Sequence, residues 1–297
     1  MTRIDPAGSA EQSDWGHRLE RARAALACPT CGGGLAFNDA GAACSACDAS
    51  YPLRNRKLYF TSPPATDDAL DSLKYRLKKG LGRLYYSVGV TIFAPTYPFN
   101  YRAAIERHCD PETGLCVDIG CGNHRVSEDL ICLDMFDYDA VDIVCDLGAL
   151  PFKADSVDAF ASRSVLEHLP GITKVVSQLK RCTRPAGINM HLIPFLFPYH
   201  ASPHDYQRYT HTGAAKLFDD WTLLEQRAAT GPVTLLLLWL IEFLSSLFSA
   251  GNERLKSYVY LLLCLLLWPL KFFDVLFTGR RSFLGMAPTI WTVVRKP

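Results

Sequence analysis

Short apolar runs alternate with longer helical stretches through residues 115–230. Five of the runs have the length and composition of buried strands, and they cover 115–119, 130–134, 141–147, 157–163 and 188–194. This alternation is typical of a parallel sheet whose strands are joined by crossover helices. Two further runs, 221–228 and 287–296, are expected to form an antiparallel pair at the end of the sheet. The pattern predicts an α/β domain over residues 101–297.

Two apolar stretches fill residues 233–278, between the last two predicted strands. Each has about twenty residues, close to the length of a helix that spans a bilayer. Glu242 interrupts the first stretch, and Lys271 and Asp274, which could pair, lie near the end of the second. Because the chain leaves and re-enters the sheet on one side, we expect a membrane-associated helical hairpin, made of transmembrane helices or lying in the interface. A soluble helical cap over a substrate pocket, or a dimer face, is the alternative.

The residues before this domain divide into a tail, a cysteine-rich module and a linker. Residues 1–25 are polar and lack the apolar run of a signal peptide, so they predict a flexible tail. The linker, 63–100, has leucines at helical spacing with basic residues between them, which predicts a basic amphipathic helix over 73–86. Such a helix can lie on an anionic membrane surface or pack on the domain with its basic face in solvent. The basic residues are Lys74, Arg76, Lys78, Lys79 and Arg83.

Four of the eleven cysteines have the spacing C-x2-C-x12-C-x2-C. They are Cys28, Cys31, Cys44 and Cys47. Two knuckles at this spacing can place four thiolates around one tetrahedral ion, so residues 26–62 predict a zinc ribbon with a structural Zn2+. Metal binding would supply much of the folding energy of so short a segment. Several other cysteines lie inside apolar runs, which argues against a secreted disulfide framework and favours a reducing cytosol.

The segments CPTCGGGLAF and CSACDASYPLRNRKLYF also resemble the small zinc-ribbon protein that activates several tRNA and release-factor methyltransferases. The resemblance covers residues 26–62. Residues 55–58 read Asn-Arg-Lys-Leu where that family usually has Asp-Gly-Ile-Pro. This departure leaves the zinc ligands intact and changes the loop that would carry a partner surface.

An acidic residue and two glycines appear together in the sequence Val-Asp-Ile-Gly-Cys-Gly, residues 117–122. Gly120 and Gly122 allow the backbone to approach a ligand, as at the carboxyl ends of parallel strands in dinucleotide sites. The acids near the ends of the first three strands are Asp118, Asp134 and Asp146. At these positions a carboxylate either accepts hydrogen bonds from a ligand or caps a turn. The pattern G-x-G-x-x-G is missing its last glycine, which is Arg125 here, and this argues against a dehydrogenase.

The segments DIGCG, LD, CDLGALPF and SVDAFASRSVLEHL, in this order and spacing, resemble class I S-adenosylmethionine-dependent methyltransferases of the methyltransferase-11 type. The resemblance implies a Rossmann-like, seven-stranded sheet and S-adenosylmethionine as the cofactor. It implies that Gly120 and Gly122 hold the methionine part and that Asp134 holds the ribose. Asp146 and Leu147 would meet the adenine. Asn-His-Arg at 123–125 replaces the third glycine and shortens the first crossover.

Polar and aromatic residues cluster after the fifth strand, within residues 194–210. The candidates for acceptor binding and catalysis are His200, His204, Asp205, Tyr206 and Arg208. This loop follows the carboxyl end of a strand and resembles the PHDYxRYT box of the same family, so we expect it to face the ligand crevice. Either histidine is a candidate general base, whereas Asp205 and Arg208 could instead pair and fix the loop. For Glu167 and His168 we expect packing at a helix start rather than catalysis.

Charge and composition narrow the function further. Thirty-one basic and thirty acidic residues nearly cancel, so bulk electrostatic binding to nucleic acid is not indicated. The sequence favours a membrane-associated methyltransferase with its catalytic domain on the cytoplasmic side. Its acceptor would be lipid-linked or amphipathic, such as a glycolipid, a polyprenyl-linked sugar or a quinone-like ring. The alternatives are methylation of RNA or protein, and a catalytically silent membrane scaffold; the oligomeric state stays open.

Overall fold

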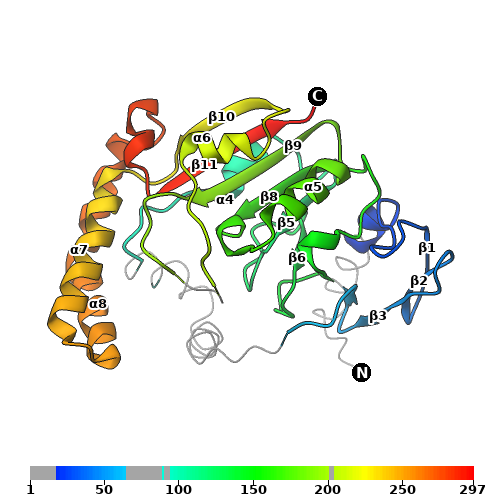
Figure 1. The fold of residues 1–297 in the computed structure, drawn as a ribbon, viewed down its shortest axis with the longest axis horizontal. Helices are drawn as coiled ribbons and strands as arrows, with labels where there is room; N and C mark the ends of the chain where they lie inside the picture. Colours follow the sequence, from blue (N-terminus) through cyan, green and yellow to red (C-terminus); the bar gives the residue numbers. More distant parts are fainter. Residues whose placement is uncertain (1–17, 65–88, 90–93, 201–203) are drawn as a thin grey trace, which may run out of the picture.

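The strands of the chain form one continuous sheet (Figure 1). The computed structural model describes residues 18–64, 89, 94–200 and 204–297. The α/β domain contributes β5 Cys116–Ile119, β6 Ile131–Asp134, β7 Ile143–Val144, β8 Val157–Arg163, β9 Thr183–Pro194, β10 Thr222–Ala228 and β11 Thr289–Arg295. Strands β7, β6, β5, β8 and β9 are parallel neighbours in that order, and β11 lies antiparallel between β9 and β10. The predicted parallel strands and the antiparallel last pair are confirmed.

The sheet contains 11 strands, not the seven that we expected, because the cysteine-rich module joins it edge to edge. The strands of this module are β1 Leu35–Asn38, β2 Gly41–Cys44, β3 Ser50–Arg54 and β4 Lys57–Tyr59. β4 pairs in parallel with β7, so that Leu58 lies beside Ile143 and Tyr59 beside Val144. Without this pairing, β7 would end the sheet with a row of unpaired backbone groups. The module is therefore continuous with the sheet of the α/β domain.

Residues 18–25 pack against the α/β domain, although we expected them to belong to a flexible tail. This segment contains a helical turn and buries Ala22 completely. The Arg18 guanidinium pairs with the Glu128 carboxylate at 2.9 Å. The predicted basic amphipathic helix over 73–86 lies outside the described residues.

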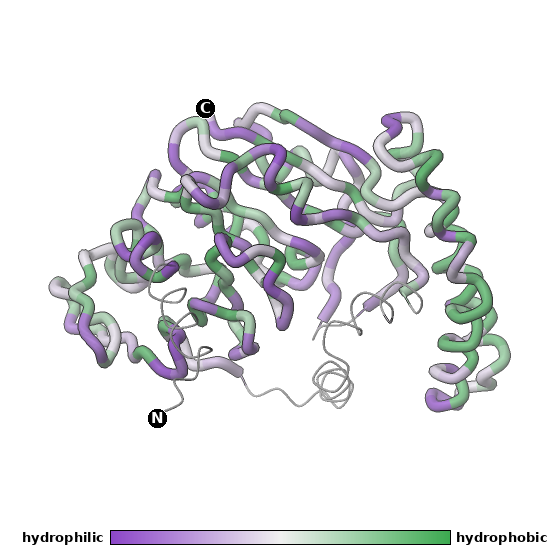
Figure 2. Tube along the Cα trace, turned by 180° about the vertical axis from the view of Figure 1, so that it is seen from behind, coloured by the Kyte–Doolittle hydropathy of each residue, from purple (hydrophilic) through white to green (hydrophobic). Residues whose placement is uncertain are grey.

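Two apolar helices leave the sheet between β10 and β11 and project from the end of the molecule opposite the cysteine-rich module (Figures 1 and 2). They are α7 Pro232–Ser249 and α8 Glu253–Leu267, followed by the 3-10 segments η4 Trp268–Leu276 and η5 Arg281–Met286. Asp274, which we expected could pair with Lys271, accepts three backbone hydrogen bonds of 2.9–3.0 Å at the start of α7. Lys271 donates to the carbonyl oxygen of Ala94. Asp274 thereby ties the returning chain to the base of the hairpin.

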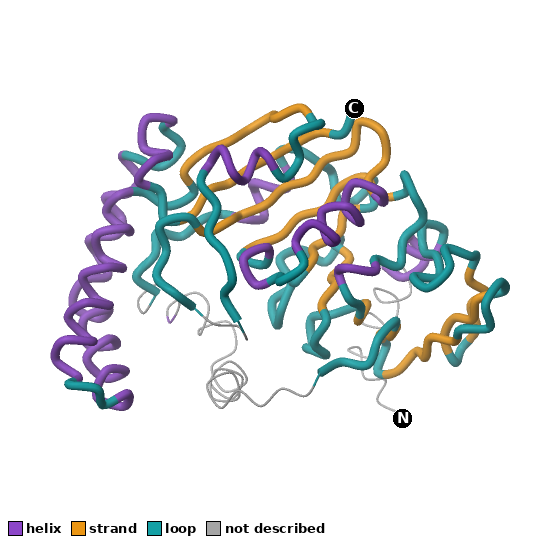
Figure 3. Tube along the Cα trace, viewed as in Figure 1, coloured by secondary structure: helices purple, strands orange, loops and turns teal. Residues whose placement is uncertain are grey.

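Helices cover both faces of the sheet (Figure 3). They are α4 Tyr101–Glu106, α5 Ile172–Cys182 and α6 His211–Lys216. Val175 and Leu179 of α5 lie one helical turn apart and pack into the core on one face. On the other face α4 packs against Trp291, which is fully buried. Successive residues of β8 point to opposite faces of the sheet: Phe160 packs in the core on the α5 face, and Ala159 packs in the core on the α4 face.

Candidate functional site

The glycine turn after β5 lies at the carboxyl edge of the parallel strands. Because β6 and β7 are the next two strands along the sheet, the ends of all three meet at this edge. Gly120 has a φ of 64° and Gly122 a φ of 59°, a region that side chains with a Cβ rarely adopt. A Cβ on Gly120 would lie 2.5 Å from the Val165 side chain, whereas one on Gly122 would meet no described atom within 4 Å. The turn is therefore packed at Gly120 and open at Gly122.

Arg125 stabilises the shortened crossover between β5 and β6, residues 120–130, all of which are described and none of which is helical. Its guanidinium donates to the carbonyl oxygens of Leu130 and Ala140 at 2.9 and 2.8 Å and to the Asp142 carboxylate at 2.7 Å. These bonds hold the crossover against β6 and β7 without a helix. The residue that interrupts the glycine pattern thus has a structural role.

Asp118 lies at the foot of the glycine turn and is only 2% exposed. The Tyr101 hydroxyl donates a hydrogen bond of 2.8 Å to its carboxylate, and the Arg163 guanidinium lies over the Tyr101 ring. Burial raises the pKa of Asp118 to about 6, although the Tyr101 hydrogen bond and the Arg163 charge act in the opposite direction. Asp118 therefore joins the turn to α4.

Asp134 and Asp146 differ in exposure. Asp134 is 7% exposed, accepts a hydrogen bond of 2.8 Å from the backbone N–H of Gly122, and has its pKa raised by burial. Asp146 is exposed beside the buried Leu147, and it accepts a hydrogen bond of 2.8 Å from the backbone N–H of Gly148. Both acids cap turns, and a carboxylate has about four lone-pair sites in all, so capacity remains for a ligand.

An ion pair holds the loop after β9. Both terminal guanidinium nitrogens of Arg208 bond the Asp205 carboxylate, and Arg208 also donates to the carbonyl oxygens of Phe197 and Pro198. Asp205 accepts a hydrogen bond of 2.9 Å from the backbone N–H of His200. Burial opposes the charge on Asp205, but the hydrogen bonds from Arg208 and His200 lower its pKa overall. The structure thus brings together Asp205, Arg208 and His200.

Glu167 and His168 connect this loop to the carboxyl end of β8, a role that the sequence did not indicate. Glu167 is fully buried, and its Oε1 lies 3.5 Å from Nε2 of His200 and 3.6 Å from Nε2 of His168. Nδ1 of His168 lies 2.6 Å from the carbonyl oxygen of His204. The side chains of His204 and Tyr206 are exposed, with 5.6 Å between their ring centroids. The available signal was the position of Glu167 just beyond the fourth strand.

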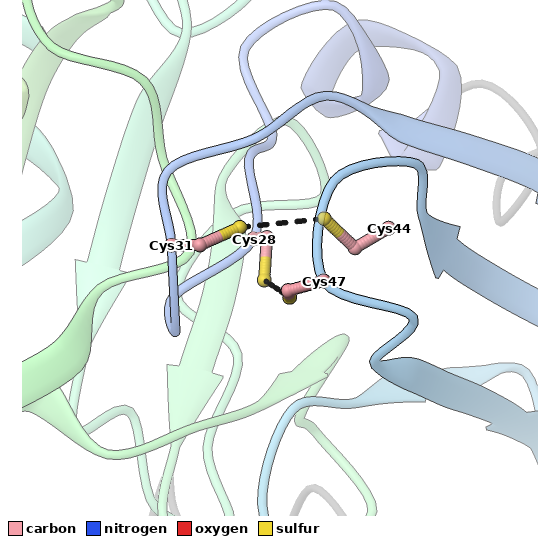
Figure 4. A group of neighbouring side chains, drawn as sticks. All are labelled: Cys28, Cys31, Cys44 and Cys47. Carbon is pink, nitrogen blue, oxygen red and sulfur yellow. Dashed lines mark hydrogen bonds between the residues drawn. The ribbon is translucent and has the colours of Figure 1, made fainter.

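The four cysteines of the N-terminal module converge (Figure 4). Sγ of Cys28 lies 3.6 Å from Sγ of Cys47, and Sγ of Cys31 lies 3.5 Å from Sγ of Cys44. Zn–S bonds of about 2.3 Å in a tetrahedron separate the sulfurs by about 3.8 Å, so the four thiols fit a zinc ion. Burial opposes ionisation of Cys28, but hydrogen bonds, above all from Tyr51 at 2.9 Å, lower its pKa to about 6.

Residues 117–190 match the family model of a methyltransferase domain. The match begins in β5 and ends in β9, and it includes the glycine turn and the acids at the ends of β6 and β7. The matched part of the α/β domain is therefore similar to a methyltransferase domain. A comparison with curated proteins gave no match.

Solved structures of similar architecture include three methyltransferase systems. The complex of the Haloferax volcanii Trm112 methyltransferase activator with a methyltransferase has 16% identity, covering 78% of this chain and 100% of that chain, with a TM-score of 0.44. The Haemonchus contortus phosphoethanolamine N-methyltransferase 2 has 15% identity, covering 74% and 60%, with a TM-score of 0.43. The Burkholderia thailandensis 1,6-didemethyltoxoflavin-N1-methyltransferase has 12% identity, covering 88% and 98%, with a TM-score of 0.42. Similarity at this level assigns no activity.

Proposed function

We propose that this chain transfers the methyl group of S-adenosylmethionine to a lipid-linked or amphipathic acceptor at a membrane surface. The proposal rests on one juxtaposition: a methyltransferase domain with a glycine turn and acids at one sheet edge carries an exposed apolar hairpin. The bound cofactor would supply an electrophilic methyl group. The residues of the chain would position donor and acceptor and remove a proton where the acceptor needs it.

The donor would lie across the ends of β5, β6 and β7. Gly120 shapes the turn, and the open side at Gly122 admits the methionine part. Asp134 would accept hydrogen bonds from the ribose hydroxyls in addition to the one that it accepts from the turn. The exposed carboxylate of Asp146 would accept from the adenine amino group, while the buried Leu147 packs against the ring.

The acceptor would approach the loop after β9. Asp205 and Arg208 fix this loop through their ion pair, and they act as positioning residues. His204 is the candidate general base because its side chain is exposed and accessible to a substrate proton. Tyr206, also exposed, would contact the acceptor beside it. The ring of His200 instead faces the buried Glu167.

The hairpin supports the membrane assignment. Pro232–Ser249 and Glu253–Leu276 are long and apolar enough to cross a membrane, and only 39% and 17% of these stretches are buried. Figure 2 shows apolar residues along both helices. Exposed examples are Leu236, Phe243, Leu247, Leu262 and Leu266. A soluble cap would bury such side chains, and an apolar surface this extended is typical of a membrane or protein contact. Because S-adenosylmethionine is supplied in the cytosol, we expect the catalytic domain on the cytoplasmic side.

Calorimetric titration of the detergent-solubilised protein with S-adenosylmethionine tests the donor site. We expect binding that Asp146→Ala weakens by about tenfold or more, the loss of one charge-assisted hydrogen bond. Asp219→Ala, at an acid with a 68% exposed side chain, is the matched control and should bind normally. Absence of binding by folded, zinc-loaded protein would refute the assignment. Binding without methyl transfer to any membrane lipid extract would favour the silent scaffold.

Extraction of membranes tests the location. We expect detergent to release the protein and high salt to leave it in place, because apolar contact is insensitive to ionic screening. The double variant Leu262→Lys/Leu266→Lys puts charges on an exposed apolar face and should shift the protein toward the soluble fraction. Release of the unaltered protein by salt alone would contradict the membrane hairpin.

A further inference from the structure

The carboxylate of Glu167 is buried and unusual among the described acids. Its side chain is fully buried, and neither carboxylate oxygen has a hydrogen-bond partner in the described part of the chain. Burying a charged carboxylate in this state is strongly unfavourable unless a positive charge lies against it. The Nε2 atoms of His168 and His200 lie 3.6 and 3.5 Å from Oε1 of Glu167.

The hydrogen bond of His168 fixes the state of its ring. Nδ1 lies 2.6 Å from the carbonyl oxygen of His204, and a carbonyl oxygen only accepts, so Nδ1 carries the proton. In the neutral ring Nε2 then presents a lone pair toward the Glu167 carboxylate. Two acceptors cannot face each other at this separation without a cation between them. That cation is either a proton or a metal ion.

His200 completes the cluster from the other side. Its ring and that of His168 lie edge to face, with 5.0 Å between their centroids. Nδ1 of His200 lies 3.5 Å from the Asp205 carboxylate and 3.3 Å from Arg208. Arg208 can only donate, so Nδ1 accepts this hydrogen bond and Nε2 carries the proton of the neutral ring toward Glu167, a proton that a bound ion would replace. The three side chains thus offer two imidazole nitrogens and one carboxylate oxygen, all within 4.8 Å of one another.

We propose that Glu167, His168 and His200 bind one divalent transition-metal ion, with zinc as the best fit. Two imidazoles and a carboxylate are a donor set that zinc accepts at about 2.0–2.2 Å, with a further position left for water or a ligand oxygen. The carbonyl of His204 provides the supporting hydrogen bond that orients a metal-bound His168, and the carboxylate of Asp205 lies 3.5 Å from Nδ1 of His200.

The site lies next to the glycine turn. Gly120 packs directly against Val165, two residues before Glu167. A metal ion there could bind an oxygen of a molecule held at the carboxyl edge of the sheet. The metal proposal does not depend on methyl transfer, since metal binding is measured by itself.

Metal content of the purified full-length protein tests the proposal. After saturation with Zn2+ and removal of loose metal, we expect one more ion per chain than the cysteine cluster holds. Glu167→Gln, His168→Asn and His200→Asn should each lose this ion and keep the zinc of the cysteine cluster. His108→Asn is the matched control, because His108 also faces a carboxylate, that of Glu225 at 2.6 Å, outside the cluster. It should retain both ions.

Substitution with Co2+ separates the two sites by their ligands. The thiolate charge-transfer absorption of the cysteine cluster should persist in all three variants, while the bands of the nitrogen- and oxygen-bound ion disappear. Cys44→Ser should give the reverse pattern. Persistence of the thiolate absorption and an unchanged circular dichroism spectrum show that each variant is folded. The proposal is overturned if saturated wild-type protein holds only the cysteine-bound ion, or if the three variants keep the second one. The occupant between His168 and Glu167 is then a proton.

Discussion

Gly120 and Gly122 share one backbone conformation but have different surroundings. Gly122→Ala introduces strain alone, because its Cβ would meet no described atom, and it should cost about 1 kcal/mol. Gly120→Ala adds a clash with Val165 inside a packed region and should cost about 1–3 kcal/mol more. Denaturant unfolding of the two variants measures the difference.

Val165→Ala provides the control for this pair. It removes the two methyl groups that a Cβ at residue 120 would meet at 2.5 and 2.8 Å. The double variant Gly120→Ala/Val165→Ala should therefore be less destabilised than the sum of its two single variants. Equal costs for Gly120→Ala and Gly122→Ala would show that the contact with Val165 is unimportant.

The position of a site residue could be predicted where a short sequence motif fixes it. It could not be predicted where the role depends on which side chains are buried together. Asp118, Asp134 and Asp146 lie at or next to the ends of strands that the apolar pattern located, and parallel pairing brings those ends together. Glu167 was assigned to helix-start packing, because nothing in the sequence shows that the loop after β9 returns over β8. The return of this loop over β8 also brings the ring of His200 toward Glu167.

At the scale of elements, the start of α7 depends on a carboxylate from the returning chain. Asp274 accepts hydrogen bonds from the backbone N–H groups of Gly231, Val233 and Thr234. These groups belong to a helix start and have no partner within the helix. Asp274→Ala should therefore cost about 1–2 kcal/mol or more, measured by chemical unfolding in detergent.

Two other variants locate this effect. Asp274→Asn keeps an acceptor oxygen and should cost less than Asp274→Ala. Glu106→Gln breaks an exposed ion pair between Arg102 and Glu106 in α4, outside the hairpin, and such pairs contribute little. A loss at Glu106 as large as that at Asp274 would argue against capping as the anchor.

Elements with a strong period were predicted, and short ones were not. The strands of the α/β domain and the apolar hairpin are apparent as runs of fixed length and spacing. β4 spans only Lys57–Tyr59, too short for a pattern, and its partner β7 lies far along the chain. The 11-stranded sheet therefore could not be inferred, since pairing between modules depends on contacts remote in sequence.

At the scale of the whole molecule, the cysteine-rich module belongs to the same sheet as β5, β6 and β7, whose carboxyl ends form the proposed S-adenosylmethionine site. β4 pairs with β7, and β7 pairs with β6, which ends at Asp134. Removal of zinc by a chelator, or Cys44→Ser, should unfold the module and expose the β7 edge. We expect a lower thermal midpoint and weaker binding of S-adenosylmethionine. Thermal unfolding scans and calorimetric titrations of the same samples measure the two effects.

Cys109→Ser is the control for the ribbon experiment, because Cys109 lies outside the four-cysteine cluster. It should change neither zinc content nor cofactor affinity. If zinc-free protein binds S-adenosylmethionine with unaltered affinity, the carboxyl ends of β5, β6 and β7 keep their arrangement without the zinc ribbon.

β11 lies between β9 and β10 in the sheet, yet it follows the apolar hairpin in the chain. On the ribosome, β9, β10 and both apolar helices are therefore synthesised before the strand that joins the two sheet strands. With a membrane hairpin, bilayer insertion can begin while the sheet still lacks an inner strand. Under the proposed membrane association, the order of translation would couple targeting to maturation: the sheet of the α/β domain closes only after the hairpin has been made.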